Sequence, residues 1–266
     1  MKPMVLGCGA ALAAVLALAF PASAKAAEAE ACPGLVARRN LPIIPAALGR
    51  DEVGITFVGH ATFLIESPGG IRIATDYNDY LRPPVTPDVA SMNKAHTTHF
   101  SHAPDPAIRY VLRGWNPAGG PASHDIEVGD VRILNVVTNI RDWGGGTERD
   151  GNSIFVFQTA GLCIAHLGHL HHTLTPEHLK QIGRIDVVLV PVDGSYTLDT
   201  EGMVEVLKAL NAPLMVPMHY FGQATLRRFV DRVRREWPVA FHDTASIVVS
   251  RASLPQAPRF MVLPGP

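Results

Sequence analysis

Three things are scarce in this 266-residue sequence: cysteine, aromatic side chains and net charge. Its three cysteines include no C-x-x-C pair, which excludes a zinc site built from paired cysteines. A net charge of −1 provides no strong field to attract nucleic acid or anionic lipid. No Gly-rich phosphate loop follows the first expected strand, and Ser195 lacks the flanking glycines of a Gly-x-Ser-x-Gly elbow. Nucleotide binding and serine-nucleophile catalysis therefore fit poorly.

Long apolar runs are also absent, except at the start of the chain. Lys2 precedes a nearly unbroken apolar stretch at 5–20, and small residues at 21–24 form a cleavage site. The pattern predicts a signal peptide at 1–24 and a periplasmic or secreted protein. A membrane anchor is the weaker alternative, because a span needs roughly 18–20 apolar residues. We expect an N-terminal arm at 25–50 and one domain at 51–266.

Two cysteines would remain after cleavage, Cys32 and Cys163. An oxidising compartment permits a disulfide between them. Cys163 lies in an apolar run, however, where a buried free thiol is equally expected. Both alternatives stay open.

Short strand patterns separated by Gly and Pro dominate the chain from Gly54 onward. They give way to alternating strands and helices, and the Pro-rich tail after residue 250 reads as irregular. Two packed sheets with helices outside fit this mixed α/β pattern, and a doubly wound sheet is the competing fold. The expected strands are 55–58, 61–65, 71–75, 125–128, 131–137, 153–159, 162–165, 187–190, 214–216 and 246–250, and the expected helices are 175–182, 198–210 and 224–236.

Twelve histidines are present, and many are clustered in loops that follow expected strands. His96 and His99 share one segment, His169 lies in a histidine-rich run at 166–172, and His219 follows a strand directly. Neutral imidazoles from separate loops can converge on one metal ion. Isolated histidines are more often ordinary surface or core residues, and this is the expected role of His124, His178 and His242.

Several segments in order resemble the metallo-β-lactamase-fold hydrolases, in the branch similar to ascorbate-6-phosphate lactonase. The resemblance covers residues 54 to 221 and implies a four-layer αββα sandwich. It rests on the opening hairpin at 55–65 with Asp76 after the next strand, Gly-Asn-Ser at 151–153, the segments at 164–168 and 190–197, and Pro-Met-His-Tyr at 217–220.

The metal-ligand signature of that family, His-x-His-x-Asp-His, is altered in this chain. The best register places Lys94 and Thr98 at the first His and at the Asp, and keeps His96 and His99. By the same resemblance, Asn139 falls near the next ligand and His169 stands where the metal-bridging Asp is expected, whereas His219 is unchanged. The lost carboxylates and the added lysine disfavour two dications.

We therefore expect one metal ion, zinc before manganese or iron, held by some of His96, His99, His169 and His219. Its bound water would attack a small ester, lactone or phosphoester, a small-molecule substrate. Asp193 and Asp76 could accept a proton, orient a ligand histidine or simply cap a loop. Lys94 could steady an oxyanion or be a surface residue.

A catalytically degenerate protein that binds a metal or ligand without hydrolysis is the alternative. The lost carboxylates favour it. The concentration of imidazoles favours the enzyme, because unconstrained drift would leave unrelated side chains. A nucleic-acid partner is not expected, since no basic groove or aromatic ladder is evident.

Overall fold

The computed structural model describes residue 1, residues 48–142 and residues 144–265. Apart from residue 1, the predicted signal peptide at 1–24 lies outside the described residues. The arm up to residue 47 and Cys32 lie outside them as well. Export and the domain limits therefore stay predictions. Cys163 is a free, half-buried thiol.

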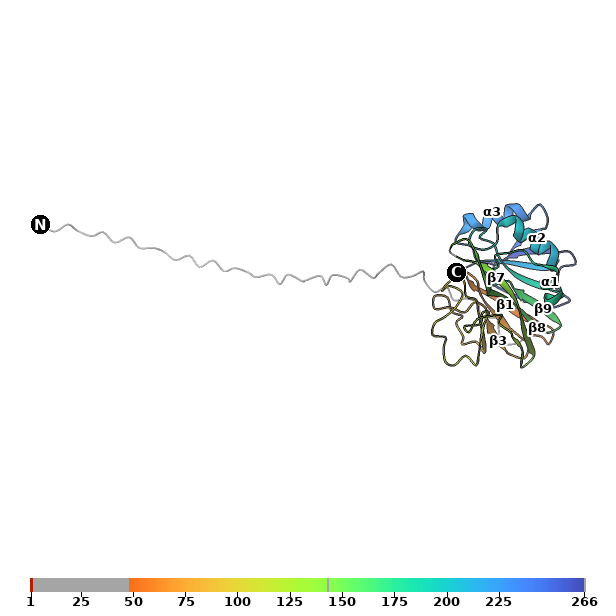
Figure 1. The fold of residues 1–266 in the computed structure, drawn as a ribbon, viewed down its shortest axis with the longest axis horizontal. Helices are drawn as coiled ribbons and strands as arrows, with labels where there is room; N and C mark the ends of the chain where they lie inside the picture. The colour runs from red at the N-terminus through yellow and green to blue at the C-terminus, as the bar shows by residue number, and fades with distance from the viewer. Residues whose placement is uncertain (2–47, 143, 266) are drawn as a thin grey trace. The chain divides into compact units, whose positions relative to one another are not determined.

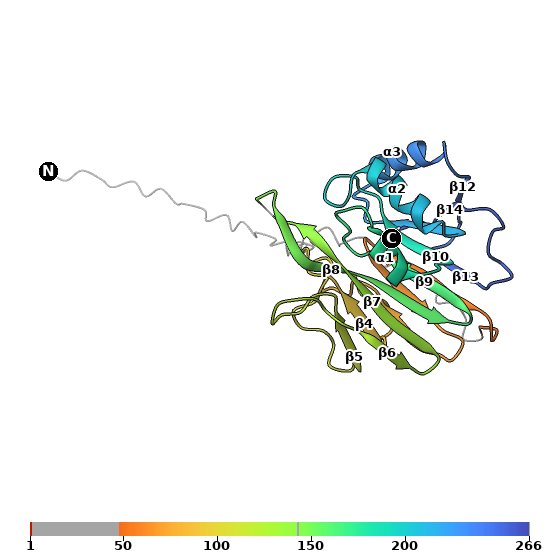
Figure 2. The same cartoon turned by 45° about the vertical axis from the view of Figure 1, so that its right-hand side comes forward.

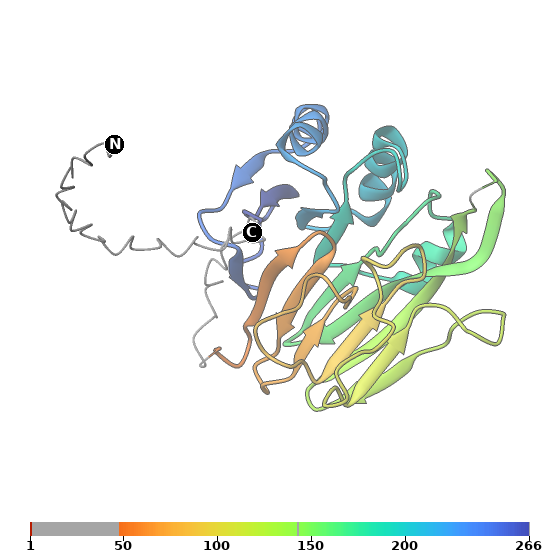
Figure 3. The ribbon, with the colours of Figure 1, turned by 90° about the vertical axis from the view of Figure 1, so that its left-hand side faces the viewer.

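Two mixed β-sheets pack against each other, with the strands of the first in front of those of the second in Figure 3. The first sheet has the spatial order β13 (Ser246–Val249), β1 (Val53–Gly59), β2 (Thr62–Glu66), β3 (Arg72–Ala74), β4 (Val89–Met92), β5 (Tyr110–Arg113). The second has the order β12 (Val239–Phe241), β14 (Arg259–Val262), β11 (Leu214–Met218), β10 (Val187–Pro191), β9 (Leu162–His166), β8 (Thr147–Thr159), β7 (Val131–Arg141), β6 (Asp125–Val128).

The core between the sheets follows from alternation along the strands. In β1, Val53, Ile55 and Phe57 all face the second sheet, because side chains two residues apart share a face. They pack with residues such as Phe155 and Leu189 from the opposite strands. This apolar layer accounts for the continuous β-branched and aromatic character of the predicted strands.

Among the described residues three helices cover the outer face of the second sheet, on the upper right of Figure 1. Helix α2 begins after Asp199, whose side chain accepts a hydrogen bond from Gly202 N–H. None of the helices in the described range is long and apolar enough to cross a membrane. Their bounds are α1 (Pro176–Ile182), α2 (Thr200–Leu210) and α3 (Gln223–Val233).

The outer face of the first sheet carries loops at 75–88 and 93–109 in the described residues. Ala74 and Met92 on this face pack with Tyr77 and Ile108 from the loops. The predicted α/β sandwich is confirmed, with helices against one sheet and these loops against the other.

Several strands differ from the expectations: β4, β5 and β12 were not predicted, and two further differences lie in the second sheet. The tail was predicted to be irregular, but β14 runs parallel between β11 and β12 because Phe260 and Val262 join the helix-covered core. Strands β7 and β8 are longer than predicted and form a hairpin, which projects in Figure 2. The polar residues 147–150 hid this extension, since backbone pairing and polar side-chain contacts hold it in place of an apolar core.

The parallel strands place their carboxyl ends at one edge, which is where ligand-binding loops gather in such sheets. β9, β10 and β11 are mutually parallel, and so are β3 and β4. The loops after them carry Asp76, His96, His169, Asp193 and His219. The fold thus collects the predicted site residues from distant parts of the chain.

Candidate metal centre

Backbone strain marks the edge of the sandwich where these loops meet. His60, in the β1–β2 turn, has φ 51°, Asp76 has φ 41°, and His219 has φ 55°. Left-handed backbone is uncommon for residues other than glycine and clusters at functional sites. The amide of His219 donates to the carbonyl of His60 at 2.6 Å, which joins the two sheets at this point.

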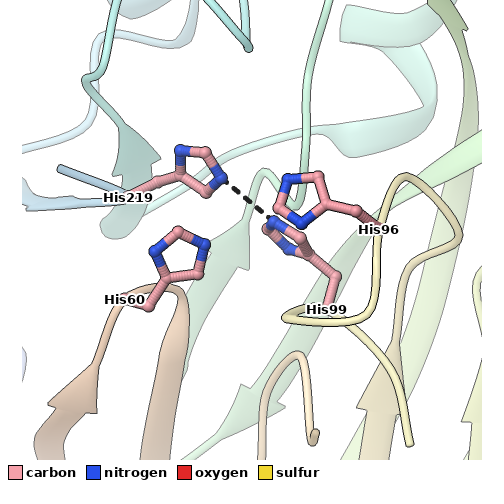
Figure 4. Close-up of side chains that lie close together, drawn as sticks. All are labelled: His60, His96, His99 and His219. Carbon is pink, nitrogen blue, oxygen red and sulfur yellow. Dashed lines mark hydrogen bonds between the residues drawn. The ribbon is translucent and has the colours of Figure 1, made fainter. Parts of the chain in front are cut away.

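Four imidazoles from three segments face a common centre in Figure 4. One ring nitrogen from each of His60, His96, His99 and His219 lies within 4.8 Å of the others. His169 is adjacent, with its ring centroid 4.7 Å from those of His96 and His99 and 4.8 Å from that of His219. The structure therefore brings the four predicted histidines together and adds His60.

His99 and His219 are each backed by a carboxylate. The Nδ1 of His99 lies 2.5 Å from Oδ2 of Asp76, and the Nδ1 of His219 lies 3.0 Å from Oδ1 of Asp193. Because a carboxylate accepts, each Nδ1 carries the hydrogen and each Nε2 keeps a bare lone pair. These two Nε2 atoms face each other at 3.0 Å. Two lone pairs at this distance repel unless a cation lies between them.

Asp193 both caps its loop and orients His219. Its carboxylate accepts hydrogen bonds from the amides of Ser195, Tyr196 and Thr197 and from the Thr197 hydroxyl. Burial disfavours the charged carboxylate, but the hydrogen bonds from His219 and Thr197 outweigh it and hold the pKa of Asp193 well below its ordinary value. Asp193 therefore stays ionised beside the site.

Asp76 is the less acidic of the two carboxylates. It is fully buried, and burial raises its pKa to about 6 against the opposing effects of His166 and the Asn93 hydrogen bond. At neutral pH it is still mostly ionised and accepts from His99. Both aspartates thus fix the histidine tautomer, as the outer partners of metal-ligating histidines do.

A different arrangement backs His96 and His169. The backbone amide of Arg141 donates to Nδ1 of His171 at 2.6 Å, so neutral His171 carries its hydrogen on Nε2. That nitrogen lies 2.5 Å from Nδ1 of His169, which must accept. His169 then carries its own hydrogen on Nε2, 3.0 Å from Nε2 of His96.

The same chain of hydrogen bonds continues to the first hairpin. Since Nε2 of His96 accepts from His169, its Nδ1 donates to the Thr98 hydroxyl at 2.7 Å. The Thr98 hydroxyl also lies 3.0 Å from Nε2 of His60, to which it can donate or from which it can accept. One backbone donor at Arg141 therefore sets the direction of every step through to Thr98.

Three ring nitrogens therefore carry no hydrogen and have a lone pair for a metal ion: the Nε2 atoms of His96, His99 and His219. Ligand nitrogens of a tetrahedral zinc ion, each about 2.1 Å from the metal, lie about 3.3 Å from one another. The observed 3.0 Å between His99 and His219 is close to this spacing. Three neutral imidazoles with an open fourth position suit a catalytic divalent ion, so these residues fit the expected metal.

Burial favours the neutral form, which a metal ligand must have, in several of these imidazoles. Burial, with smaller contributions from His219 and His96, lowers the pKa of His60 to about 3. Burial also holds the pKa of His99 and His169 well below the ordinary range, and lowers that of His171 to about 4.

Lys94 and Asn139, both aligned with ligand positions of the signature, have other roles in the structure. The Lys94 amino group pairs with Glu148 on the extended hairpin and is half-exposed. Asn139 is exposed, and its side chain accepts from the amide of Asp150. The site instead gains His60, which the signature did not identify, and Thr98, which stands at the Asp position of the signature.

The Gly-Asn-Ser segment supports the site from beneath. Asn152 accepts from the amide of His169 at 2.8 Å and donates to Thr138. Gly168 has φ 61°, and a Cβ there would lie 2.4 Å from side-chain atoms of both Asn93 and Asn152. Only glycine therefore lets the His169 loop approach so closely.

Aromatic rings border the site on the solvent side. Phe221 and Tyr196 are 59% and 60% exposed, and their ring centroids lie 5.3 Å apart. Phe221 is also 5.5 Å from His219 and 5.8 Å from His60. Such exposed apolar rings beside an ionic centre offer contact area for a ligand.

A surface hollow of about 560 Å³ lies near the opposite ends of β7, β8 and β9. It is lined by the charged side chains of Asp130, Arg132 and Arg184 and contains no histidine. Its chemistry offers no counterpart to the imidazole cluster, which remains the candidate site.

Comparison with known proteins gives matches over most of the chain. The β-lactamase superfamily domain family matches residues 54–219. A protein of Methanoculleus marisnigri named UPF0173 metal-dependent hydrolase is 26% identical over 199 residues, covering 68% of this chain and 87% of that protein. One of the same name from Myxococcus xanthus is 24% identical over 269 residues, covering 90% and 94%.

A crystal structure from Thermotoga maritima, described as that of a candidate Zn-dependent hydrolase of the metallo-β-lactamase superfamily, is also similar. Its TM-score is 0.59 at 28% sequence identity, with 80% of this chain and all of that chain covered. The arrangement of sheets and helices described above is therefore shared with that protein.

Proposed function

Because the chain belongs to the β-lactamase superfamily domain family, we propose that it is a metal-dependent hydrolase with one ion held by His96, His99 and His219. The observation that carries the proposal is the pair of bare Nε2 atoms of His99 and His219, which face each other at 3.0 Å. A shared cation removes their repulsion. The names of the relatives, metal-dependent hydrolases, agree with it.

Each residue has a separate task in this proposal. His96, His99 and His219 hold the ion, and Asp76 and Asp193 orient the last two rings by accepting hydrogen bonds from their Nδ1 atoms. When bound, a zinc ion lowers the pKa of a coordinated water toward neutrality and so supplies a nucleophile. His60 lies beside these three histidines, with its Nε2 hydrogen-bonded to the Thr98 hydroxyl.

We favour one ion over two on the basis of charge. Thr98 and His169 occupy the positions where the family signature has carboxylates. No carboxylate other than Asp76 and Asp193 hydrogen-bonds to the clustered imidazoles among the described residues, and both of these are engaged with Nδ1 atoms. Three imidazoles suit zinc, with manganese or iron as alternatives.

The proposed substrate is a small ester, lactone or phosphoester with an apolar part. Phe221 and Tyr196 support the apolar part, since exposed rings beside the centre could bury it. A lactone, the substrate type of the family branch that the sequence resembles, is one of these proposed substrates. Lys94, paired with Glu148, is given no catalytic step.

The predicted signal peptide supports a periplasmic or secreted location for this activity. It also implies that the mature protein meets small molecules outside the cytoplasm. No nucleic-acid partner is proposed, because the chain has a net charge of −1.

Elemental analysis and a hydrolysis screen test the proposal together. We expect near-stoichiometric metal after mild dialysis and its loss in the double variant His96→Ala/His219→Ala. Nitrophenyl esters, a lactone and a phosphodiester should be assayed with and without chelator. Chelator-sensitive turnover supports the hydrolase. Bound metal without turnover of any of these would favour the degenerate binding protein, and absence of metal would refute both.

A further inference from the structure

We infer that His169 acts as a hydrogen-bond donor to an oxygen atom of the substrate, and is not a metal ligand. This inference rests on the proposed function, because it concerns the same site. Its starting point is the direction of the hydrogen bonds that reach His169 from the protein backbone.

The direction follows from one immovable donor. The amide of Arg141 points at Nδ1 of His171 at 2.6 Å, and an amide nitrogen cannot accept. His171 therefore has no hydrogen on Nδ1 and must donate through Nε2 to Nδ1 of His169. The reverse direction would place two hydrogens between Arg141 and His171. The Nε2 of His169 thus carries a hydrogen and has no lone pair for a metal.

The donor is aimed at the ion site itself. Its acceptor in this structure is Nε2 of His96, 3.0 Å away, which is one of the three proposed ligand atoms. Once that lone pair is given to a cation, the His169 N–H loses its acceptor while it remains buried. A buried donor without a partner is costly, so an oxygen entering the site is its natural replacement.

The oxygen that suits this donor is one that gains negative charge during reaction. The carbonyl oxygen of an ester or lactone and the phosphoryl oxygen of a phosphoester share this chemistry. A fixed N–H aimed at such an oxygen stabilises the transition state more than the ground state. His169 stands where the family signature has a metal-bridging Asp, so the substitution turns an acceptor into a donor.

The position of His169 is well fixed. Its side chain is 2% exposed, and its amide donates to Asn152 at 2.8 Å. The neighbouring Gly168 allows that close approach through its left-handed backbone. A donor with so little freedom needs no rearrangement when charge develops.

Nitrogen-15 NMR of the metal-free wild-type protein tests the hydrogen positions directly. We expect His169 and His171 both with hydrogen on Nε2 and none on Nδ1, and His99 and His219 with hydrogen on Nδ1. A His169 with hydrogen on Nδ1 would overturn the inference. Because no metal or activity is involved, this result is independent of whether the proposed function holds.

Cadmium-113 added to the same labelled protein identifies the ligands. We expect couplings to the Nε2 atoms of His96, His99 and His219 and none to His169. A coupling to His169 would overturn the inference while leaving a metal centre in place. Failure to bind cadmium or zinc at all would count against the proposed function instead, with the tautomers of the metal-free protein still measured.

Two variants separate a donor from a ligand by kinetics. In His169→Leu, which removes the donor, we expect metal content to be unchanged and kcat and kcat/KM to fall together by roughly 100-fold. His169→Gln keeps an N–H donor and should recover part of that loss. The matched control is His178→Gln, a half-buried helix-capping histidine outside the cluster where glutamine can still cap. Loss of metal in both His169 variants, comparable to that in His99→Gln, would contradict the donor role.

Discussion

The histidines on the two sides of the imidazole cluster carry their hydrogen on opposite ring nitrogens. On one side, His99 and His219 rest on carboxylates, which draw the hydrogen to Nδ1 and leave Nε2 bare. On the other side, His169 rests on His171, which is fixed by a backbone amide and leaves a hydrogen on Nε2. His96, between the two, accepts from His169 and so also presents a bare Nε2.

The difference shows that the hydrogen-bond partner of Nδ1 decides whether Nε2 of the same histidine is a metal ligand or a hydrogen-bond donor. Counting imidazoles alone would make His169 equivalent to His99, since both are buried and equally close to His96. The hydrogen-bond partners divide them into ligand and donor. Each prediction below alters one side of this comparison.

Removing a ring from the carboxylate-backed side should have the largest effect. In His99→Gln we expect zinc content to fall close to zero and hydrolysis to drop by about 1,000-fold, because a metal ion contributes several kcal/mol to such a step. Elemental analysis and ester hydrolysis measure both. His242→Gln, at a half-buried histidine outside the cluster, should change neither. Full zinc occupancy in His99→Gln would break the comparison.

Neutralising a backing carboxylate should have a smaller effect on the same side. Asp76→Asn retains the shape and tolerates the left-handed backbone, but it removes the charge behind His99. We expect zinc affinity to fall by about 10–100-fold, measured by competition with a chelating dye. Asp199→Asn, which keeps a helix N-cap, is the control. Equal affinities in the two variants would contradict an orienting role for Asp76.

Acid should destabilise the metal-free protein through both sides. The pKa values of His60 and His171 are lowered to about 3 and about 4, so below pH 6.5 the unfolded chain binds protons that the folded protein does not. The raised pKa of Asp76, about 6, opposes this trend between about pH 6 and 4. Because the lowered histidines outnumber it, we expect the free energy of unfolding to fall on the order of 2 kcal/mol from pH 7.5 to 5.

Urea unfolding of chelator-treated protein at the two pH values measures this loss. The zinc-loaded protein should lose its metal over the same range, because protons compete for the ligand nitrogens. Stability that is constant or greater at pH 5 would show that the cluster does not hold its imidazoles neutral.

The aromatic border should have the smallest effect. Phe221→Ala removes a ring that lies beside both His219 and His60, and we expect KM for an aromatic ester to rise several-fold, with kcat nearly unchanged. Phe241→Ala is a matched control, since Phe241 is equally exposed at 59% but lies in β12. Equal KM values in the two variants would remove Phe221 from the substrate site.

The sequence predicted much of the fold because its core strands are short apolar runs between clear turn signals. The strands β1 to β3 and β7 to β9 and the three helices follow from such local patterns, whereas the short strands β4, β5 and β12 were not predicted. Strand β14 was missed because its pairing depends on partners at 213–216 and 238–241, far away in the chain. The polar end of the β7–β8 hairpin was hidden for a related reason, since backbone pairing and distant polar contacts such as Lys94–Glu148 support it.

For the site, the sequence identified which loops carry imidazoles but not what each ring presents. His60 was overlooked as a site residue because a single histidine in a tight turn gives no spacing pattern. The feature that could have identified His60 is its position after Gly59, in the turn of a hairpin that ends at the site. The donor role of His169 could not be predicted, because it depends on an amide 28 positions earlier.

Anomalous diffraction at the zinc absorption edge, on crystals of the protein loaded with zinc, tests the central claim most directly. The account predicts one strong peak, bonded to the Nε2 atoms of His96, His99 and His219 at about 2.1 Å and not to His169. No peak among these nitrogens, or two peaks about 3.5–4 Å apart bridged through position 169, would contradict it.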